Sequence, residues 1–314
     1  MALFFLCSMD VHFEKYDGHE YINYTDPLDR DITLIKKEGK LVKIVDSLFR
    51  QAHSITPNSA KFFVVGDMHG HIAISIRALK GWEQFSGIKT NQILQVGDMG
   101  AASYNSEMDK ATAEMAKKDA SELDFLHLHH KNMNSGEMYY AEQMLKDRQI
   151  YFPNGNHDDE LFLYDNYFKE TPNDKDYFRY IPTGKIIDVL NNGRKIRIAG
   201  IGYNNKREFK DTKGYPAEIL LTHTPAKNTT YPYGNEEITK YIKEHAPLYH
   251  FFGHARNAAI LSNPEHNSYG LNAVYNPKSG IQEGSIGFLD INNNQEHKFI
   301  YIPEQILNDM SKLV

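Results

Sequence analysis

The stretch Phe62-Phe63-Val64-Val65-Gly66-Asp67-Met68-His69-Gly70 is the part of this sequence that decides its fold. A run of apolar residues bounded by a glycine predicts a buried strand, and the glycine permits the tight turn that follows. The turn places Asp67 and His69, both of metal-ligand type, directly after the strand. We therefore interpret this segment as a strand of an α/β sheet that ends in a candidate metal site.

The same pattern of an apolar run followed by a ligand-type residue recurs along the chain. The further pieces are, in order, Gly97-Asp98, Gly155-Asn156-His157-Asp158, Thr222-His223 and Gly253-His254. Each piece alone is explained as well by a surface loop or a helix N-cap. Open α/β sheets bind ligands at the carboxyl ends of their strands, so the pieces together predict that these side chains converge in one crevice.

The remaining pattern predicts an α/β fold with mixed sheets. Short apolar runs alternate with helical periodicity at 71–85 and 158–168, whereas runs near 271–275, 286–291 and 299–302 follow one another without helices. This change from alternation to consecutive strands favours mixed sheets over a purely parallel one.

Two segments stand apart from this strand pattern. Residues 105–147 are polar with helical periodicity, which predicts a helical insertion in a catalytic domain that spans 58–314. We expect the insertion to shape substrate choice. Residues 1–57 are interpreted as an N-terminal extension that packs on the core, with an amphipathic helix at 41–49.

The composition is that of an ordinary globular chain. The 314 residues are 41% hydrophobic, and 35 Lys+Arg against 41 Asp+Glu give a net charge of −6. A surface that binds nucleic acid is normally basic, so we expect no strong nucleic-acid surface. The sequence carries no signal for an oligomeric state.

The cysteine content and the start of the chain favour a cytoplasmic location. Cys7 is the single cysteine, so no internal disulfide can form. The apolar opening lacks basic residues and soon meets Asp10 and Glu14, which is not typical of a signal peptide. No window reaches the roughly 18 apolar residues of a membrane-spanning helix, so we expect no membrane partner.

The ordered motifs resemble the signature of the calcineurin-like metallophosphoesterase superfamily over about residues 60–303. The resemblance implies a four-layer α/β/β/α sandwich of two mixed sheets with two divalent metal ions at the strand ends. It implies that Asp67 and His69 hold the first ion, that Asp98 bridges both, and that Asn156, His223 and His254 hold the second. Oxygen and imidazole ligands without thiolate suit manganese, iron or zinc, and magnesium only at the position richer in oxygen.

The activity implied by the resemblance is hydrolysis of a phosphomonoester or a phosphodiester. A hydroxide activated by the ions would attack phosphorus, and His157 would protonate or stabilise the leaving oxygen. A nuclease or cyclic-nucleotide phosphodiesterase is the alternative enzyme. The alternative outside the enzymes is a catalytically silent scaffold that binds partners through 105–147.

The sequence departs from the family pattern at two places. Many members carry a second histidine where this chain has Arg256, and a guanidinium cannot ligate a metal. Arg256 is therefore either a phosphate-binding residue or an ordinary surface arginine. The motif at Asp98 continues with Met99-Gly100-Ala101, without the Asp and Arg-Gly of the Ser/Thr protein phosphatase branch, which disfavours that activity. Asp158 and Asp159 are candidates either to support His157 or to begin the following helix.

Two further groups of residues carry weaker signals. His127, His129 and His130 are expected to be a solvated or partner-facing cluster rather than a second metal site, because neighbouring positions on a helix point in different directions. Residues 203–207 either line the pocket with polar and aromatic groups or form an exposed loop.

Overall fold

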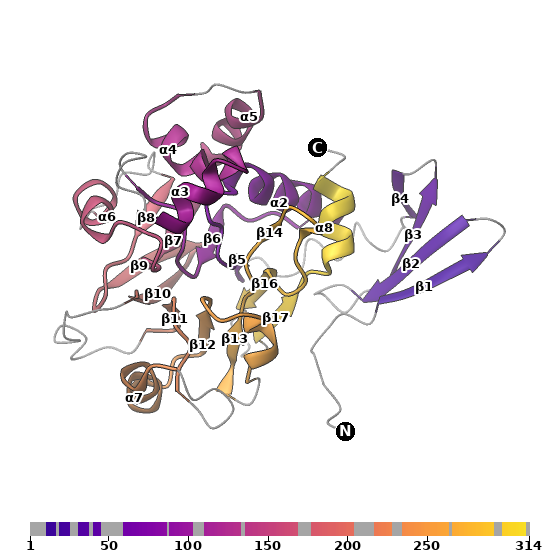
Figure 1. Cartoon of the computed structure of the whole chain (residues 1–314). Helices are drawn as coiled ribbons and strands as arrows, with labels where there is room; N and C mark the ends of the chain where they lie inside the picture. Colours follow the sequence, from indigo (N-terminus) through magenta and orange to yellow (C-terminus); the bar gives the residue numbers. More distant parts are fainter. Residues whose placement is uncertain are drawn as a thin grey trace.

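The computed structural model describes residues 11–16, 19–25, 31–37, 40–44, 59–86, 88–102, 110–132, 136–168, 177–203, 217–227, 234–263, 266–291 and 297–311. Within these residues, two large mixed sheets form the centre of the molecule and helices lie outside them (Figure 1). The α/β fold with two mixed sheets that the sequence predicts is therefore confirmed.

The first sheet has six strands in the order β17-β16-β5-β6-β7-β8. Its strands are β5 (Ala60–Val65), β6 (Gln92–Gln95), β7 (Gln149–Phe152), β8 (Phe178–Tyr180), β16 (Ile286–Ile291) and β17 (His297–Tyr301). The pairs from β5 to β8 are parallel, and β16 runs antiparallel to both β5 and β17. The parallel strands β5, β6 and β7 consequently end at the same edge.

The second sheet has five strands in the order β13-β12-β11-β10-β9. Its strands are β9 (Ile186–Asn191), β10 (Arg194–Ile201), β11 (Ile219–Thr222), β12 (Tyr249–Phe252) and β13 (Ser268–Gly270). The pairs from β10 to β13 are parallel, and β9 is antiparallel to β10. A separate two-stranded ribbon joins β14 (Tyr275–Asn276) to β15 (Gly280–Ile281).

Strand β5 shows why its apolar run is continuous. Phe62 and Val64 belong to a core cluster that includes Ile198 and Phe251 of the second sheet, so they point between the sheets. Phe63 and Val65 belong to a different cluster that contains helical residues. Successive side chains of a strand point to opposite faces, so a strand covered on both faces needs apolar residues at every position.

Helices cover the outer faces of both sheets. The six-stranded sheet packs against α2 (Ile72–Ser86) and α8 (Glu304–Ser311), through Ile76, Trp82 and Leu307 among other buried residues. The five-stranded sheet is covered by α7 (Glu236–His245), whose Ile238 and Tyr241 pack against Leu220 of β11. A further helix, α6 (Glu160–Tyr167), follows β7.

The described part of the segment between β6 and β7 is largely helical, and the prediction of a helical insertion over 105–147 stays a prediction. The described part contains α3 (Lys110–Ala116), the 3₁₀ turn η2 (Ala120–Leu123), α4 (Asp124–His129) and α5 (Gly136–Leu145). Phe125, Leu128 and Leu145 of this segment are buried in the same cluster as Phe63 and Ile93 of the sheet. The segment therefore contributes to the core of the domain.

Two expectations from the sequence are wrong in part. The helix predicted at 41–49 is instead strand β4 (Lys40–Ile44), in an antiparallel sheet with β1 (Val11–Tyr16), β2 (His19–Thr25) and β3 (Asp31–Lys37), while 45–49 lie outside the described residues. A short amphipathic run fits either element, and here pairing with β3 decides. Packing of this extension on the core stays a prediction.

The strand predicted at 271–275 also differs. Only Tyr275 of this run lies in a strand. Leu271 and Val274 instead donate backbone hydrogen bonds to Phe252 and Asp67, because the chain crosses the strand ends here rather than running along a neighbour. Among the described helices, none is both long and apolar enough to cross a membrane.

Candidate metal centre

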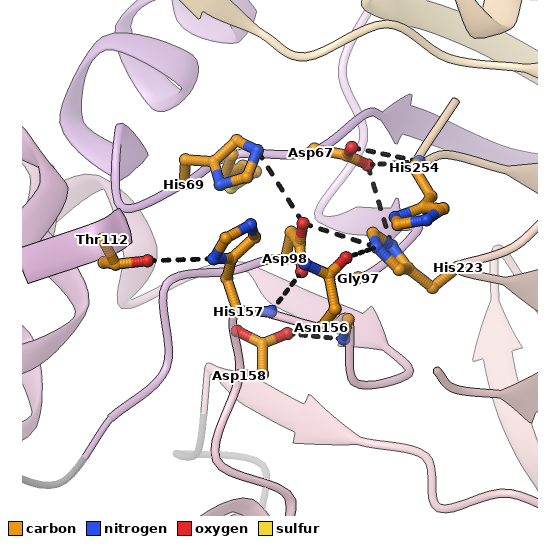
Figure 2. Close-up of polar contacts among 12 residues, drawn as sticks. Asp67, His69, Gly97, Asp98, Thr112, Asn156, His157, Asp158, His223 and His254 are labelled. Atoms are coloured by element: carbon orange, nitrogen blue, oxygen red, sulfur yellow. Dashed lines mark hydrogen bonds and ion pairs between the residues drawn. The ribbon is translucent and has the colours of Figure 1, made fainter. Parts of the chain in front are cut away.

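The predicted ligands come together at one edge of the two sheets (Figure 2). Asp67 and His69 follow β5, Asp98 follows β6, Asn156 and His157 follow β7, His223 follows β11, and His254 follows β12. These strands are parallel neighbours within their sheets, so their carboxyl ends meet at one edge and their loops can share a site.

The backbone at three of these residues is in the left-handed region. The φ angles are 44° at His69, 54° at Asp98 and 62° at His254. Such a conformation costs on the order of 1–3 kcal/mol at a residue other than glycine and clusters at functional sites. The surrounding packing must therefore hold these side chains in place against local strain.

Two glycines allow the carboxylates to approach the neighbouring loops. A Cβ atom at Gly155 would collide with the carboxylate of Asp98, and one at Gly253 would collide with the carboxylate of Asp67. The glycines of these motifs are thus required for close packing of the loops.

Asp98 lies at the centre of the site. Its Oδ2 atom is 3.4 Å from Nε2 of His223 and 3.8 Å from Nε2 of His69. Two groups of potential metal donors occur in the described part of the chain, one formed by His69, Asp98 and His157 and the other by Asp67, Asp98 and His223. Asp98 is common to both, as a bridging carboxylate would be.

These groups differ in detail from the predicted allocation. Asp67 stands with His223 rather than with His69, and the ring of His157 stands with His69. Asn156 reaches the site through Oδ1, which is 3.0 Å from Nε2 of His223.

The histidine after β11 shows that the donor set fits a cation. Nδ1 of His223 donates to the carbonyl oxygen of Val96 at 3.0 Å, which turns Nε2 toward the oxygens of Asn156 and Asp98. Burial alone would lower the pKa of His223, but the negative charges of Asp98 and Asp67 raise it to about 9. A proton at Nε2 thus offsets the oxygens around it, and a divalent cation would offset them better.

The charges of the carboxylates support the same conclusion. Burial raises the pKa of Asp67 to about 7, with His223 opposing the rise and Asp98 adding to it. Burial would also raise the pKa of Asp98, but His223 and His69 hold it well below its usual range. Desolvation together with the charge of Asp98 raises the pKa of Asp158 to about 6. The burial of three carboxylates close together disfavours their charged forms, and divalent ions bound beside them would stabilise those forms.

The pKa values of His69 and His254 are lowered, which favours the neutral imidazole that can bind a metal ion. Desolvation lowers the pKa of His69 to about 4 and also lowers the pKa of His254. The backbone N–H of His254 donates to Oδ2 of Asp67 at 3.1 Å. The ring centroid of His254 lies 4.9 Å from that of His223 and 5.0 Å from that of Tyr203. Of the predicted segment 203–207, Tyr203 therefore lines the site, and 204–207 lie outside the described residues.

The aspartates that follow His157 hold backbone rather than its ring. The carboxylate of Asp158 accepts hydrogen bonds from the backbone N–H groups of Gly155 at 2.7 Å, Ala101 at 2.8 Å and Met99 at 3.2 Å. Asp159 accepts from the N–H of Phe162 and caps α6, as predicted for a helix start. Oγ1 of Thr112, on α3, is the group that lies 3.1 Å from Nδ1 of His157.

The remaining predicted residues lie less close to the centre. Arg256 is exposed on the turn after β12, and its phosphate-binding role stays a prediction. His129 packs into an aromatic cluster, with Nδ1 2.6 Å from the hydroxyl of Tyr167 and its ring against Phe162. His127 and His129 are half-buried and His130 is exposed, and the prediction that the three form a solvated or partner-facing cluster stays a prediction.

Two residues important for the geometry were not identified from the sequence. The side chain of Gln95 donates to the carbonyl oxygens of Gly66 and Gly97 and accepts from the N–H of Gly97, so it ties two ligand loops together. Thr112 lies in a polar helix without any motif. Neither position carries a local pattern, because its role depends on contacts made only in the fold.

The chain belongs to the calcineurin-like phosphoesterase family, whose model matches residues 60–255. Similar solved structures include TT1561 of Thermus thermophilus, with 13% identity, a TM-score of 0.44, and coverage of 78% of this chain and 99% of that one. Another is the I115M mutant of a cold-active protein tyrosine phosphatase, with 11% identity and a TM-score of 0.34. The match covers 94% of this chain and 98% of that one. No curated protein matches this chain.

Proposed function

We propose that this protein is a metal-dependent hydrolase of phosphomonoesters or phosphodiesters with a dinuclear metal centre. The observation that carries the proposal is the presence of Asp98 in both groups of potential metal donors. Membership of the phosphoesterase family supports a phosphate ester as the substrate.

The residues of the chain divide the work of the reaction in this proposal. Asp67, His69, Asp98, Asn156, His223 and His254 would hold two divalent ions, with manganese, iron or zinc suited to this donor set. When bound, the ions would supply Lewis-acid stabilisation of the phosphoryl group and lower the pKa of the attacking water. His157 would give a proton to the leaving oxygen, and Arg256 would bind a phosphate oxygen.

Metal analysis of the purified protein, combined with hydrolysis assays, tests the proposal. We expect about two ions per chain after incubation with manganese, and hydrolysis of nitrophenyl phosphate or bis-nitrophenyl phosphate that a chelator abolishes. The variant Asp188→Asn should bind metal and hydrolyse the esters as the natural protein does, because Asp188 forms an exposed ion pair with Lys195. Two bound ions without hydrolysis of either ester would favour the silent scaffold, and no bound ions would contradict the proposal.

Two finer points are also proposed. A nuclease or cyclic-nucleotide phosphodiesterase is a special case of the same chemistry, and adding a cyclic nucleotide and a short oligonucleotide to the assay distinguishes it. A cytoplasmic location is supported by the single cysteine, which cannot form an internal disulfide.

A further inference from the structure

The contact between the helical segment and the site involves a threonine and a histidine. Thr112 is 5% exposed, and its Oγ1 atom lies 3.1 Å from Nδ1 of His157. Figure 2 shows Thr112 on one side of the imidazole ring and Asp98 on the other, with His69 above the ring. The ring centroids of His157 and His69 are 5.2 Å apart. The ring therefore bridges α3 and the proposed metal centre.

A histidine that acts through one nitrogen depends on the partner of the other. A hydrogen bond at Nδ1 fixes the ring orientation and the tautomer, and so determines which nitrogen faces the reacting atoms. The neighbouring carboxylates are not that partner, because Asp158 accepts from backbone N–H groups and Asp159 caps α6. The hydroxyl of Thr112 lies within hydrogen-bond distance of Nδ1, and its oxygen can accept a hydrogen bond from Nδ1–H.

We propose that Thr112 is a positioning residue that acts through His157. The hydroxyl oxygen of Thr112 accepts from Nδ1–H and thereby presents Nε2 to the leaving oxygen of the substrate. This inference rests on the proposed phosphoesterase function.

The proton balance of the step is simple. Water oxygen attacks phosphorus, and the bond from phosphorus to the leaving oxygen breaks with its electron pair on that oxygen. His157 enters the step as the imidazolium, with a proton on each ring nitrogen. The leaving oxygen takes the proton from Nε2, and the proton released by the attacking water restores it. The Nδ1–H bond to Thr112 is kept throughout.

The part of the helical segment that follows α3 contacts the loop after His69 and the start of α2 at several other points. Oδ2 of Asp119 is 3.2 Å from Nε2 of His71, and the carboxylate of Asp124 accepts from the N–H of Ala73 at 2.9 Å. A Cβ atom at Gly70, directly after His69, would collide with the backbone of Glu122. The loop that carries His69 is thus packed against η2 and α4, and the N–H of Asp119, at the start of η2, donates to the carbonyl oxygen of Met115 in α3 at 2.9 Å.

Three variants separate positioning from a merely structural role. Thr112→Val removes the hydroxyl and keeps the shape of the side chain, whereas Thr112→Ser keeps the hydroxyl. The matched control is Thr239→Val on α7, whose hydroxyl donates to backbone oxygens, those of Lys227 at 2.8 Å and Asn235 at 3.1 Å. Thermal unfolding of all variants shows whether the fold is kept.

The first readout is imidazole ¹⁵N NMR of the metal-free protein at a pH where the ring of His157 is neutral, with His157→Ala to assign the signal. We expect the proton on Nδ1 in the natural protein and in Thr112→Ser, and a shift toward the other tautomer in Thr112→Val. An unchanged tautomer and unchanged ¹⁵N shifts in Thr112→Val would overturn the proposal, whatever the activity of the protein.

The second readout compares an alkyl phosphate with nitrophenyl phosphate in the presence of manganese. Thr112→Val should lower kcat on the alkyl ester by about tenfold, with KM and metal content unchanged and with little effect on the nitrophenyl ester. Thr112→Ser should restore the rate, and Thr112→Val in the His157→Ala background should add no further loss.

Equal losses on both esters, or additive losses in the double variant, would overturn the role of Thr112 in positioning His157. If the natural protein hydrolyses neither ester, the proposed function fails, and the NMR measurement still decides whether Thr112 sets the tautomer of His157.

Discussion

The backbone N–H of His157 donates a 2.8 Å hydrogen bond to Oδ1 of Asp98. This bond joins the loop after β7 to the loop after β6, and it joins the proposed proton donor to the proposed bridging ligand. Oδ2 of Asp98 faces His69 and His223, so this carboxylate holds the loops together with one oxygen and faces the proposed metal positions with the other. Replacing Asp98 with asparagine can therefore test metal binding while the hydrogen bond from the N–H of His157 is kept.

Asp98→Asn should lose most of the activity and more bound metal than Asp67→Asn. The amide oxygen can still accept from the N–H of His157, but the charge shared by both ions is gone. Metal content by mass spectrometry and turnover of an aryl phosphate check this expectation, with Asp188→Asn as the control on a remote ion pair. Two retained ions and near-normal turnover in Asp98→Asn would show that this carboxylate does not bridge.

His157→Ala should keep the metal content and lower kcat by about 10² to 10⁴, as for a general acid. The loss should be far larger on an alkyl ester, whose alkoxide is strongly basic, than on a nitrophenyl ester, whose phenolate leaves unaided. Equal losses would indicate that His157 orients the phosphate. Loss of one ion would indicate that His157 is a metal ligand, as its position in one group of potential donors with His69 and Asp98 would allow.

Arg256→Ala should raise KM for a phosphate ester by about tenfold or more, from loss of a charge-assisted contact of about 1.5–3 kcal/mol. Initial rates over a range of substrate concentrations measure the effect. The control is Arg77→Ala, because Arg77 forms an ion pair with Glu137 at 2.8 Å on α2 and α5. Kinetics that match the natural protein would make Arg256 an ordinary surface arginine.

Local patterns could predict that these side chains lie close together, because each proposed ligand follows its own strand. The apolar run and the polar residue after it are adjacent in sequence, so the positions of Asp67, Asp98 and His223 could be inferred without the fold. The contact of Thr112 with His157 spans 45 positions and has no local signature. The strand at 40–44 was missed for a related reason, since only its pairing with 31–37 distinguishes it from a short amphipathic helix.

Asp124 should make stability depend on pH. It is 5% exposed in α4, and burial raises its pKa to about 7, with the N–H of Ala73 opposing the rise and Glu137 adding to it. In the unfolded chain the pKa is near 3.8, so the folded state binds the proton more tightly. The stability that this protonation contributes is fully present below pH 3.8 and is lost as pH rises through about 7, by at most about 1.4 kcal/mol per pH unit.

Asp124→Asn should remove this dependence, because an amide has no charge to bury and its oxygen can still accept from the N–H of Ala73. Denaturant unfolding between pH 5 and pH 8 should show a smaller loss of stability in Asp124→Asn than in the natural protein, and a higher midpoint at pH 8. Asp188→Asn, at an exposed carboxylate, should leave the slope unchanged. If Asp124→Asn has the same pH slope as the natural protein, the folded-state pKa of Asp124 is not raised and its burial is offset by its hydrogen bonds.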